Sequence, residues 1–195
     1  MTQQPLRIGM FGGAFDPPHR AHLALAHAAR EQLQLQHLHV VPTGQAWHKS
    51  RQLTPAAHRW AMCQAAFQDC PGVVLDDREL RRAGPSYTVQ TLSELASVYP
   101  GAELFLVIGW DQLSQFKTWS RFEEVLAMAS LAVAQRPGVY SDPIDPVAHR
   151  VLRFEADGVS STQLRESLAS AQTRSSAVSA LPDAVARYIA QHQLY

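Results

Sequence analysis

The stretch "MFGGAFDPPHRAH", residues 10–22, joins an apolar segment to the start of a helix. The segment "LRIGMF" (6–11), which overlaps its first two residues, predicts a buried strand. Gly12 and Gly13 follow at once, and glycine lets backbone amides approach a ligand closely or lets the chain turn. The Asp-Pro pair at Asp16 favours the beginning of a helix. The stretch therefore predicts a strand that leads through a tight turn into a helix.

Two histidines lie in the first turn of that helix. His19 and His22 are three residues apart and share one helix face, where backbone amides and the helix dipole favour an anion. Histidine pairs on helices also bind zinc, but no Cys or Glu stands at a spacing that would complete such a site. Two surface histidines that cap a helix are the third interpretation. This stretch alone leaves the three open.

The pattern of strand and helix continues along the chain. Further strands are predicted at 38–41, 73–75, 103–109, 131–135 and 151–154, and helices at 19–34, 54–67, 88–98, 120–129, 161–171 and 182–192. Such alternation predicts an α/β protein with a Rossmann-like, doubly wound, mainly parallel sheet and helices on both faces. We expect a single domain over 1–195, with an irregular surface loop near 138–150 and C-terminal helices within 161–192. Nucleotides bind beyond the carboxyl ends of such strands.

Composition limits the classes of partner. Seventeen basic residues balance seventeen acidic ones, so no global charge points to nucleic acid or a membrane, and an anion site would have to be local. The two cysteines form no CxxC or disulfide pattern, and no apolar run approaches the length of a membrane span. We expect a cytoplasmic protein. Its oligomeric state is not readable from the sequence.

A second candidate anion site lies in "DGVSSTQLRESL", residues 157–168. Ser160 and Gln163 predict a capping box at the start of a helix. Arg165 then falls in the first turn, where a cation opposes the helix dipole. An anion above this helix N-terminus would explain the conflict, and an ion pair with Glu166 or Asp157 would explain it as well.

Taken together, these segments resemble a known family. "GGAFDPPHRAH" is similar to the GGxFDPxHxGH signature of nucleotidyltransferases related to class I aminoacyl-tRNA synthetases, and "SSTQLR" resembles their ISSTxIR motif. The segments at 78–92, 107–126 and 134–138 and the C-terminal "LPDAVARYIAQHQLY" resemble bacterial nicotinate-nucleotide adenylyltransferases. The resemblance implies adenylyl transfer from ATP to nicotinate mononucleotide, with deamido-NAD and pyrophosphate as products. Mg²⁺ would arrive with ATP, without a dedicated metal site in the protein.

The resemblance also implies roles for residues around ATP. His19, His22, Lys49 and Arg165 would be catalytic, with His22 stabilising the transition state. The predicted ATP-binding residues are Gly12, Gly13, Phe15, Ser161, Thr162, Arg165, Gly109, Asp111 and Arg136. Gly109 and Asp111 would contact ribose, and Arg136 would lie near adenine.

The remaining implied roles concern nicotinate mononucleotide. Tyr87, Thr88, Trp119 and His48 are the predicted binding residues, with Trp119 stacked on the pyridine ring and His48 in a basic loop that reaches the phosphates. Read without the resemblance, these signals are weaker: "HKSR" (48–51) is also typical of a solvated loop, and Trp119 of a core aromatic.

Three other functions stay open at this point. A sister enzyme would use the amidated mononucleotide or another phosphorylated acceptor such as phosphopantetheine. A sensor would bind the nucleotide without turning it over. A histidine-based zinc protein is the third, although it lacks candidate ligands.

One position departs from the family signature. Ala21 stands where HxGH has glycine, and its methyl group would crowd a close approach of ATP to the backbone. Alanine is the smallest replacement and favours a helix by roughly 1 kcal/mol over glycine. We therefore expect Ala21→Gly to change the ATP KM by less than about tenfold, equivalent to ~1.4 kcal/mol. Steady-state kinetics would test this, and an enzyme active only with glycine would contradict it.

Overall fold

The strand β1 (Arg7–Gly13) lies in the middle of a parallel sheet in the computed structural model of this protein. Its neighbours are β2 (His37–Pro42) and β4 (Glu103–Gly109), and Met10 at its centre is in register with both. The continuous apolar run predicted at 103–109 is confirmed as β4, whose central side chains are buried. Buried on both faces, such a strand needs apolar residues at successive positions.

The structure describes residues 4–44, 52–135, 147–155 and 159–195. Within them the sheet has six strands in the order β3-β2-β1-β4-β5-β6, and every neighbouring pair is parallel. The outer strands are β3 (Val73–Leu75), β5 (Ala129–Ala134) and β6 (His149–Leu152). The strand order reverses between β1 and β4, so loops that leave their carboxyl ends diverge and open a crevice.

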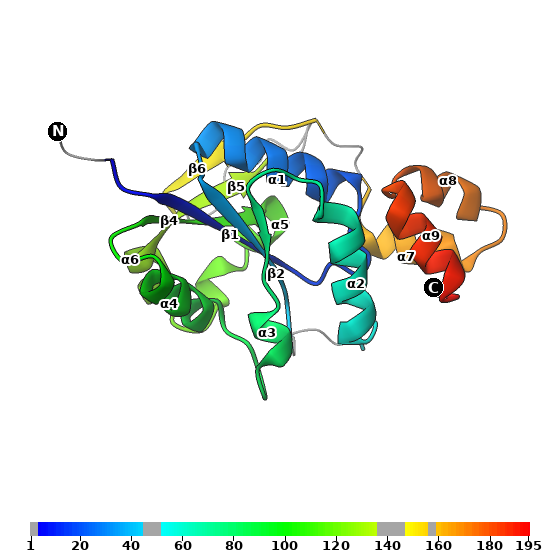
Figure 1. Cartoon of the computed structure of the whole chain (residues 1–195), viewed down its shortest axis with the longest axis horizontal. Helices are drawn as coiled ribbons and strands as arrows, with labels where there is room; N and C mark the ends of the chain where they lie inside the picture. Colours follow the sequence, from blue (N-terminus) through cyan, green and yellow to red (C-terminus); the bar gives the residue numbers. More distant parts are fainter. Residues whose placement is uncertain (1–3, 45–51, 136–146, 156–158) are drawn as a thin grey trace.

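Helices cover both faces of the sheet, which confirms the doubly wound prediction (Figure 1). One apolar core lies under α1 (Arg20–Leu33), α2 (Ala56–Phe67) and α7 (Ser161–Ala169). The other lies under α4 (Thr88–Val98) and α6 (Phe122–Met128). Successive side chains of β4 alternate between the two cores, as strand geometry requires.

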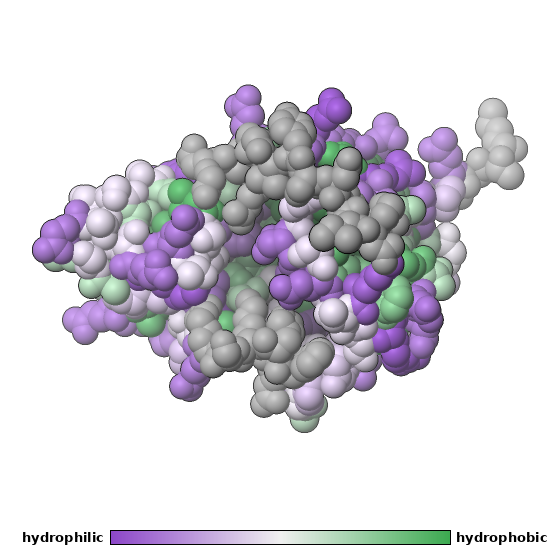
Figure 2. Space-filling view, turned by 180° about the vertical axis from the view of Figure 1, so that it is seen from behind, coloured by the Kyte–Doolittle hydropathy of each residue, from purple (hydrophilic) through white to green (hydrophobic). Residues whose placement is uncertain are grey.

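The C-terminal helices gather at one end of the molecule (Figure 1). Here α7 contacts α8 (Arg174–Ser179), while α9 (Asp183–Gln191) packs against α2. Figure 2, seen from behind, shows hydrophilic residues at this end mixed with residues of intermediate and hydrophobic character. Among the described residues, no helix is both long and apolar enough to cross a bilayer.

The predicted elements are present, with shifted boundaries and some omissions. The strand β6 begins at His149, so the last two residues of the loop predicted at 138–150 pair with β5 instead. The short helices α3 (Arg78–Arg81) and α5 (Trp110–Leu113) and the 3-10 turn η1 (Phe116–Thr118) were not predicted, nor was α8. Most of these segments are too short to display a helical repeat of apolar residues.

Candidate active site

The two glycines at the end of β1 have different surroundings. A Cβ on Gly12 would meet only the Met10 Cε atom, at 3.7 Å, whereas one on Gly13 would lie 3.2 Å from the Phe15 ring. Phe15 itself adopts a left-handed φ of 47°. Its buried ring packs edge-on against Phe11, with 5.3 Å between ring centroids, which holds this conformation in place. The backbone after β1 is therefore uncovered by side chains at Gly12 and is held in place by the packing of Phe15.

The two predicted histidines lie against each other at the start of α1. His19 is the N-cap, and its backbone N–H donates to Nδ1 of His22 at 3.1 Å. The ring centroids are 3.8 Å apart. Burial, reinforced by the neighbouring His19, holds the pKa of His22 well below its usual range. A bound anion would act in the opposite direction and raise the pKa of His22, because a nearby negative charge favours the charged form.

The helix α1 begins at Arg20, close to the predicted start, but the expected N-cap role of Asp16 is wrong. The N-cap lies three residues later, and the Asp16 side chain turns inward and is fully buried. Its carboxylate accepts hydrogen bonds from the Tyr195 hydroxyl at 2.5 Å and from the Thr54 backbone N–H at 3.3 Å. A buried carboxylate needs such donors, and the interior supplies them here.

The second motif reaches across to the first. Ser160 caps α7 and forms the predicted capping box with Gln163. Arg165 donates from Nη1 to the Asp16 carbonyl oxygen at 2.7 Å and from Nη2 to the Thr162 hydroxyl at 3.0 Å. Arg165 is the fifth residue of α7, just past the first turn predicted for it, and its guanidinium bonds to another loop. We call His19, His22, Ser161, Thr162 and Arg165 the clamp; it joins the N-termini of α1 and α7.

A pocket of about 370 Å³ lies at the carboxyl ends of β1 and β4. Six residues predicted from the sequence line it: Gly12, Gly13, Tyr87, Thr88, Asp111 and Trp119. Other polar lining residues were not predicted: Thr43, Glu79, Ser86, Gln112, Gln115, Thr118 and Ser120. Thr43 directly follows β2, and that position beyond a strand end was a usable signal.

The far wall of the pocket is formed where β4 ends. A Cβ on Gly109 would lie 2.7 Å from Oδ1 of Asp111, so the absence of a side chain lets this carboxylate fold back toward the strand. The half-buried Trp119 ring packs against Phe116, with 5.2 Å between ring centroids. An aromatic face and a carboxylate thus border the same opening.

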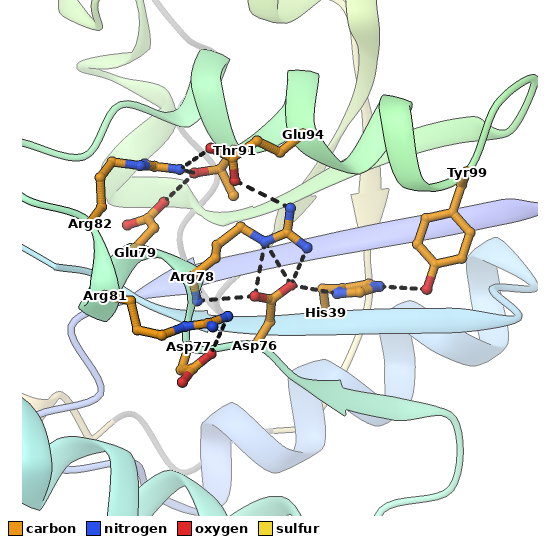
Figure 3. A network of polar contacts seen from close by, with 10 residues as sticks. All are labelled: His39, Asp76, Asp77, Arg78, Glu79, Arg81, Arg82, Thr91, Glu94 and Tyr99. Atoms are coloured by element: carbon orange, nitrogen blue, oxygen red, sulfur yellow. Dashed lines mark hydrogen bonds and ion pairs between the residues drawn. The ribbon is translucent and has the colours of Figure 1, made fainter.

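A polar network supports the near wall, where Glu79 lines the pocket (Figure 3). Oε1 of Glu79 accepts a hydrogen bond from the Thr91 hydroxyl at 2.7 Å, and Arg82 bridges Thr91 to Glu94. Burial raises the pKa of Glu79, against the opposing effect of the Thr91 bond. The Glu79 backbone carbonyl would lie 2.2 Å from a Cβ on Gly44, so this wall tolerates only glycine there.

The same network continues under the sheet edge. Asp76 is buried between His39, at 2.8 Å, and the Arg78 guanidinium, at 2.7 Å. Burial alone would raise the pKa of Asp76, but hydrogen bonds from His39 and Arg78 hold it well below its usual range. Arg78 also contacts Glu94 at 3.3 Å, which ties α3 to α4 (Figure 3). Charged pairs therefore fix the segment that carries Glu79.

Most of the predicted site residues thus belong to two adjoining groups, the clamp and the pocket; Phe15 and Gly109 belong to neither. Residues 12–14 line the pocket and lead directly into the loop that Arg165 contacts. Three predicted residues lie outside the described residues: His48, assigned to nicotinate mononucleotide, Lys49, assigned as catalytic, and Arg136, assigned near adenine. Within the described part of the chain, no group of three or more His, Cys, Asp and Glu side chains is placed to hold a metal ion.

Comparisons with known proteins bear on this arrangement. A model of the cytidylyltransferase-like family matches residues 10–167. A protein of Albidiferax ferrireducens named "Probable nicotinate-nucleotide adenylyltransferase" is 48% identical, over 97% of this chain and 98% of its own length. A second protein of that name, from Oceanobacillus iheyensis, is 38% identical over 96% of each chain.

The chain belongs to the nicotinate-nucleotide adenylyltransferase family. The fold agrees: the Plasmodium falciparum nicotinic acid mononucleotide adenylyltransferase complexed with NaAD superposes with a TM-score of 0.81, covering 97% of both chains at 17% identity. The family resemblance seen in the two sequence motifs is confirmed. In this member of the family, the hydrogen bond from Arg165 to the Asp16 carbonyl oxygen brings the two motifs into contact.

The Asp76–Arg78 pair predicts a stability effect. We expect Arg78→Met to lower the free energy of unfolding by about 2–4 kcal/mol, because it leaves a buried carboxylate short of its main donor. Arg81→Met is the matched control: Arg81 lies on the same short helix and pairs with Asp77, but its side chain is 73% exposed. That change should cost below about 1 kcal/mol.

Denaturant unfolding at several pH values would measure both variants. The pKa of Asp76 is depressed in the folded protein, so the stabilisation is present above the usual value of 3.8 and is lost as the pH falls below it. The deficit of Arg78→Met should therefore shrink in acid. Equal costs for the two variants at neutral pH would contradict the buried-pair interpretation.

Proposed function

We propose that this protein transfers the adenylyl group of ATP to nicotinate mononucleotide, giving deamido-NAD (nicotinate adenine dinucleotide) and pyrophosphate. The observation that carries the proposal is the junction of the clamp and the pocket. Two helix N-termini with histidine and arginine side chains suit a triphosphate. The adjoining pocket offers an aromatic face and polar groups, which suit a ribosylated pyridine.

The proposed reaction needs positioning and charge stabilisation more than covalent chemistry. An oxygen of the mononucleotide 5′-phosphate attacks the α-phosphorus of ATP. The bond from that phosphorus to the bridging oxygen of the β-phosphate breaks, and pyrophosphate leaves with the bonding electron pair. In this scheme Ser161, Thr162 and Arg165 hold the triphosphate, and His19 and His22 contact it where negative charge develops.

The mononucleotide occupies the pocket in this proposal. Trp119 stacks on the pyridine ring, and backbone amides near Tyr87 and Thr88 receive its carboxylate. Gly109 and Asp111 contact ribose. His48 and Lys49 on the phosphates, and Arg136 near adenine, stay predictions from the family resemblance.

Mg²⁺ is proposed as a companion of ATP. The clamp consists of imidazole, hydroxyl, guanidinium and helix amide groups, which suit the anionic phosphates better than a cation. Its own residues therefore do not form a Mg²⁺ site, and the phosphate oxygens would hold the ion. When bound, Mg²⁺ would neutralise charge on the departing pyrophosphate.

We further propose that the whole chain acts as a single nucleotidyltransferase domain. The support is that α7, one of the C-terminal helices, supplies Arg165 to a loop that follows the first strand. A separate C-terminal domain would not share hydrogen bonds with the centre of the clamp. A cytoplasmic location likewise stays a prediction.

One assay tests the substrate. Purified protein is incubated with ATP, Mg²⁺ and either nicotinate or nicotinamide mononucleotide, and pyrophosphate release is measured. We expect release with the acid and slower release with the amide, which lacks the carboxylate. Preference for the amide would contradict the acid-specific proposal, and ATP binding without release from either would favour a sensor.

A second experiment tests the role of His22. We expect His22→Ala to lower kcat by ~100-fold or more while ATP binding changes less, because the imidazole contacts charge that develops in the transition state. His27→Ala is the matched control, since His27 lies on the same helix with a side chain 69% exposed. Equal losses of ATP affinity and kcat in His22→Ala would indicate a simple binding role.

A further inference from the structure

Asp16 lies at the centre of the loop that connects β1 to the clamp. We call residues 14–18 the Asp16 loop; it follows Gly13 and precedes His19. Arg165 fixes its backbone through the Asp16 carbonyl, and the Ser161 hydroxyl donates to the Pro17 carbonyl at 3.1 Å. Both bonds come from α7. The Asp16 carboxylate, by contrast, points into the protein and is held from another direction.

Tyr195 holds the Asp16 carboxylate from this second direction. Its hydroxyl lies 2.5 Å from Oδ1 of Asp16, and the residue is half-buried. Burial, followed by the hydrogen bond to Asp16, raises the pKa of Tyr195. The hydroxyl therefore keeps its proton and acts as the donor in this pair.

The tail that carries Tyr195 is itself anchored. Arg174 of α8 donates to the Tyr195 backbone oxygen at 2.9 Å, and the Leu194 backbone N–H donates to the Ile189 carbonyl at 3.1 Å. Leu194 and Tyr195 also pack against the apolar core. The Tyr195 hydroxyl is therefore presented to Asp16 from a fixed position.

We propose that Tyr195 is a positioning residue for the reaction: its hydroxyl holds the Asp16 carboxylate and thereby places His19 and His22 against the ATP phosphates. The proposal rests on the proposed function. His19 follows Asp16 by three residues, so a displacement of the Asp16 loop moves the N-cap of α1 and the ring stacked on it. Small displacements of positioned groups are costly in such transfers.

Because the clamp and the pocket are distinct, the effects of Tyr195 on ATP and on mononucleotide binding can be measured separately. Tyr195 does not line the pocket, whereas the Asp16 loop leads directly into the clamp. Loss of the hydroxyl should therefore act on ATP and on the chemical step, and leave mononucleotide binding in place. A change that merely lowered the fraction of folded enzyme would alter neither Michaelis constant.

The test compares Tyr195→Phe with Tyr188→Phe in the full chain. Tyr188 serves as the control because its hydroxyl hydrogen-bonds to Nδ1 of His58 on α2 at 3.0 Å, whereas the Tyr195 hydroxyl bonds to Asp16 and also to Thr54. For Tyr195→Phe we expect kcat to fall about tenfold and the ATP KM to rise about threefold, with the nicotinate mononucleotide KM within about twofold of wild type. Tyr188→Phe should match wild type in all three constants.

Melting temperatures, measured for both variants, establish that the assay runs on folded protein. Wild-type kinetics for Tyr195→Phe, or changes equal to those of Tyr188→Phe, would overturn the positioning role. A shift confined to the mononucleotide KM would overturn it as well. Failure of the proposed function is a separate result, since wild-type protein would then release no pyrophosphate from ATP and nicotinate mononucleotide.

Discussion

The hydrogen bond from Arg165 to the Asp16 carbonyl oxygen is the contact on which the site depends. It joins residues 149 positions apart in the chain and brings two helix N-termini to one place. Neither N-terminus alone offers more than a weak anion site, because the dipole effect fades within one turn. Together the two N-termini contribute backbone amides, imidazoles, hydroxyls and a guanidinium from segments that are hydrogen-bonded to each other. The parallel sheet makes this possible, since it sends every connecting loop to the same edge.

Much of this arrangement was predictable, and the reason is local. The strands β1 and β4 are recognisable in the sequence as apolar runs because both of their faces are buried. The capping box at Ser160 was predictable because both partners lie within one turn. The cation of Arg165 near the start of a predicted helix indicated that it interacts with another group, but did not identify that group. That partner is the backbone carbonyl of Asp16. Every residue has a backbone carbonyl, so the residue types do not reveal which one accepts the bond.

The unpredicted features depend on contacts between distant segments. Asp16 has the residue type of a helix cap, but the interior offers it Tyr195 and Thr54, and these bonds outweigh the local preference. Glu79 sits on a four-residue helix without a periodic pattern, and only the folded chain places it beside the pocket. Tyr195 lies in the C-terminal segment that resembles the family, but nothing in the sequence pairs it with Asp16. Its importance emerges from its position next to Asp16.

The separation of the clamp residues also governs when the site can exist during synthesis. A chain emerging from the ribosome can pair β1, β2 and β4 once about half of its length is available, and domains begin to form in that N-terminal order. The clamp cannot form before α7 has been synthesised, and the Asp16–Tyr195 hydrogen bond cannot form before Tyr195 has been added. Contacts of such long sequence range form late and slowly. Nascent chains therefore possess a nucleotide-binding sheet well before they possess a complete site.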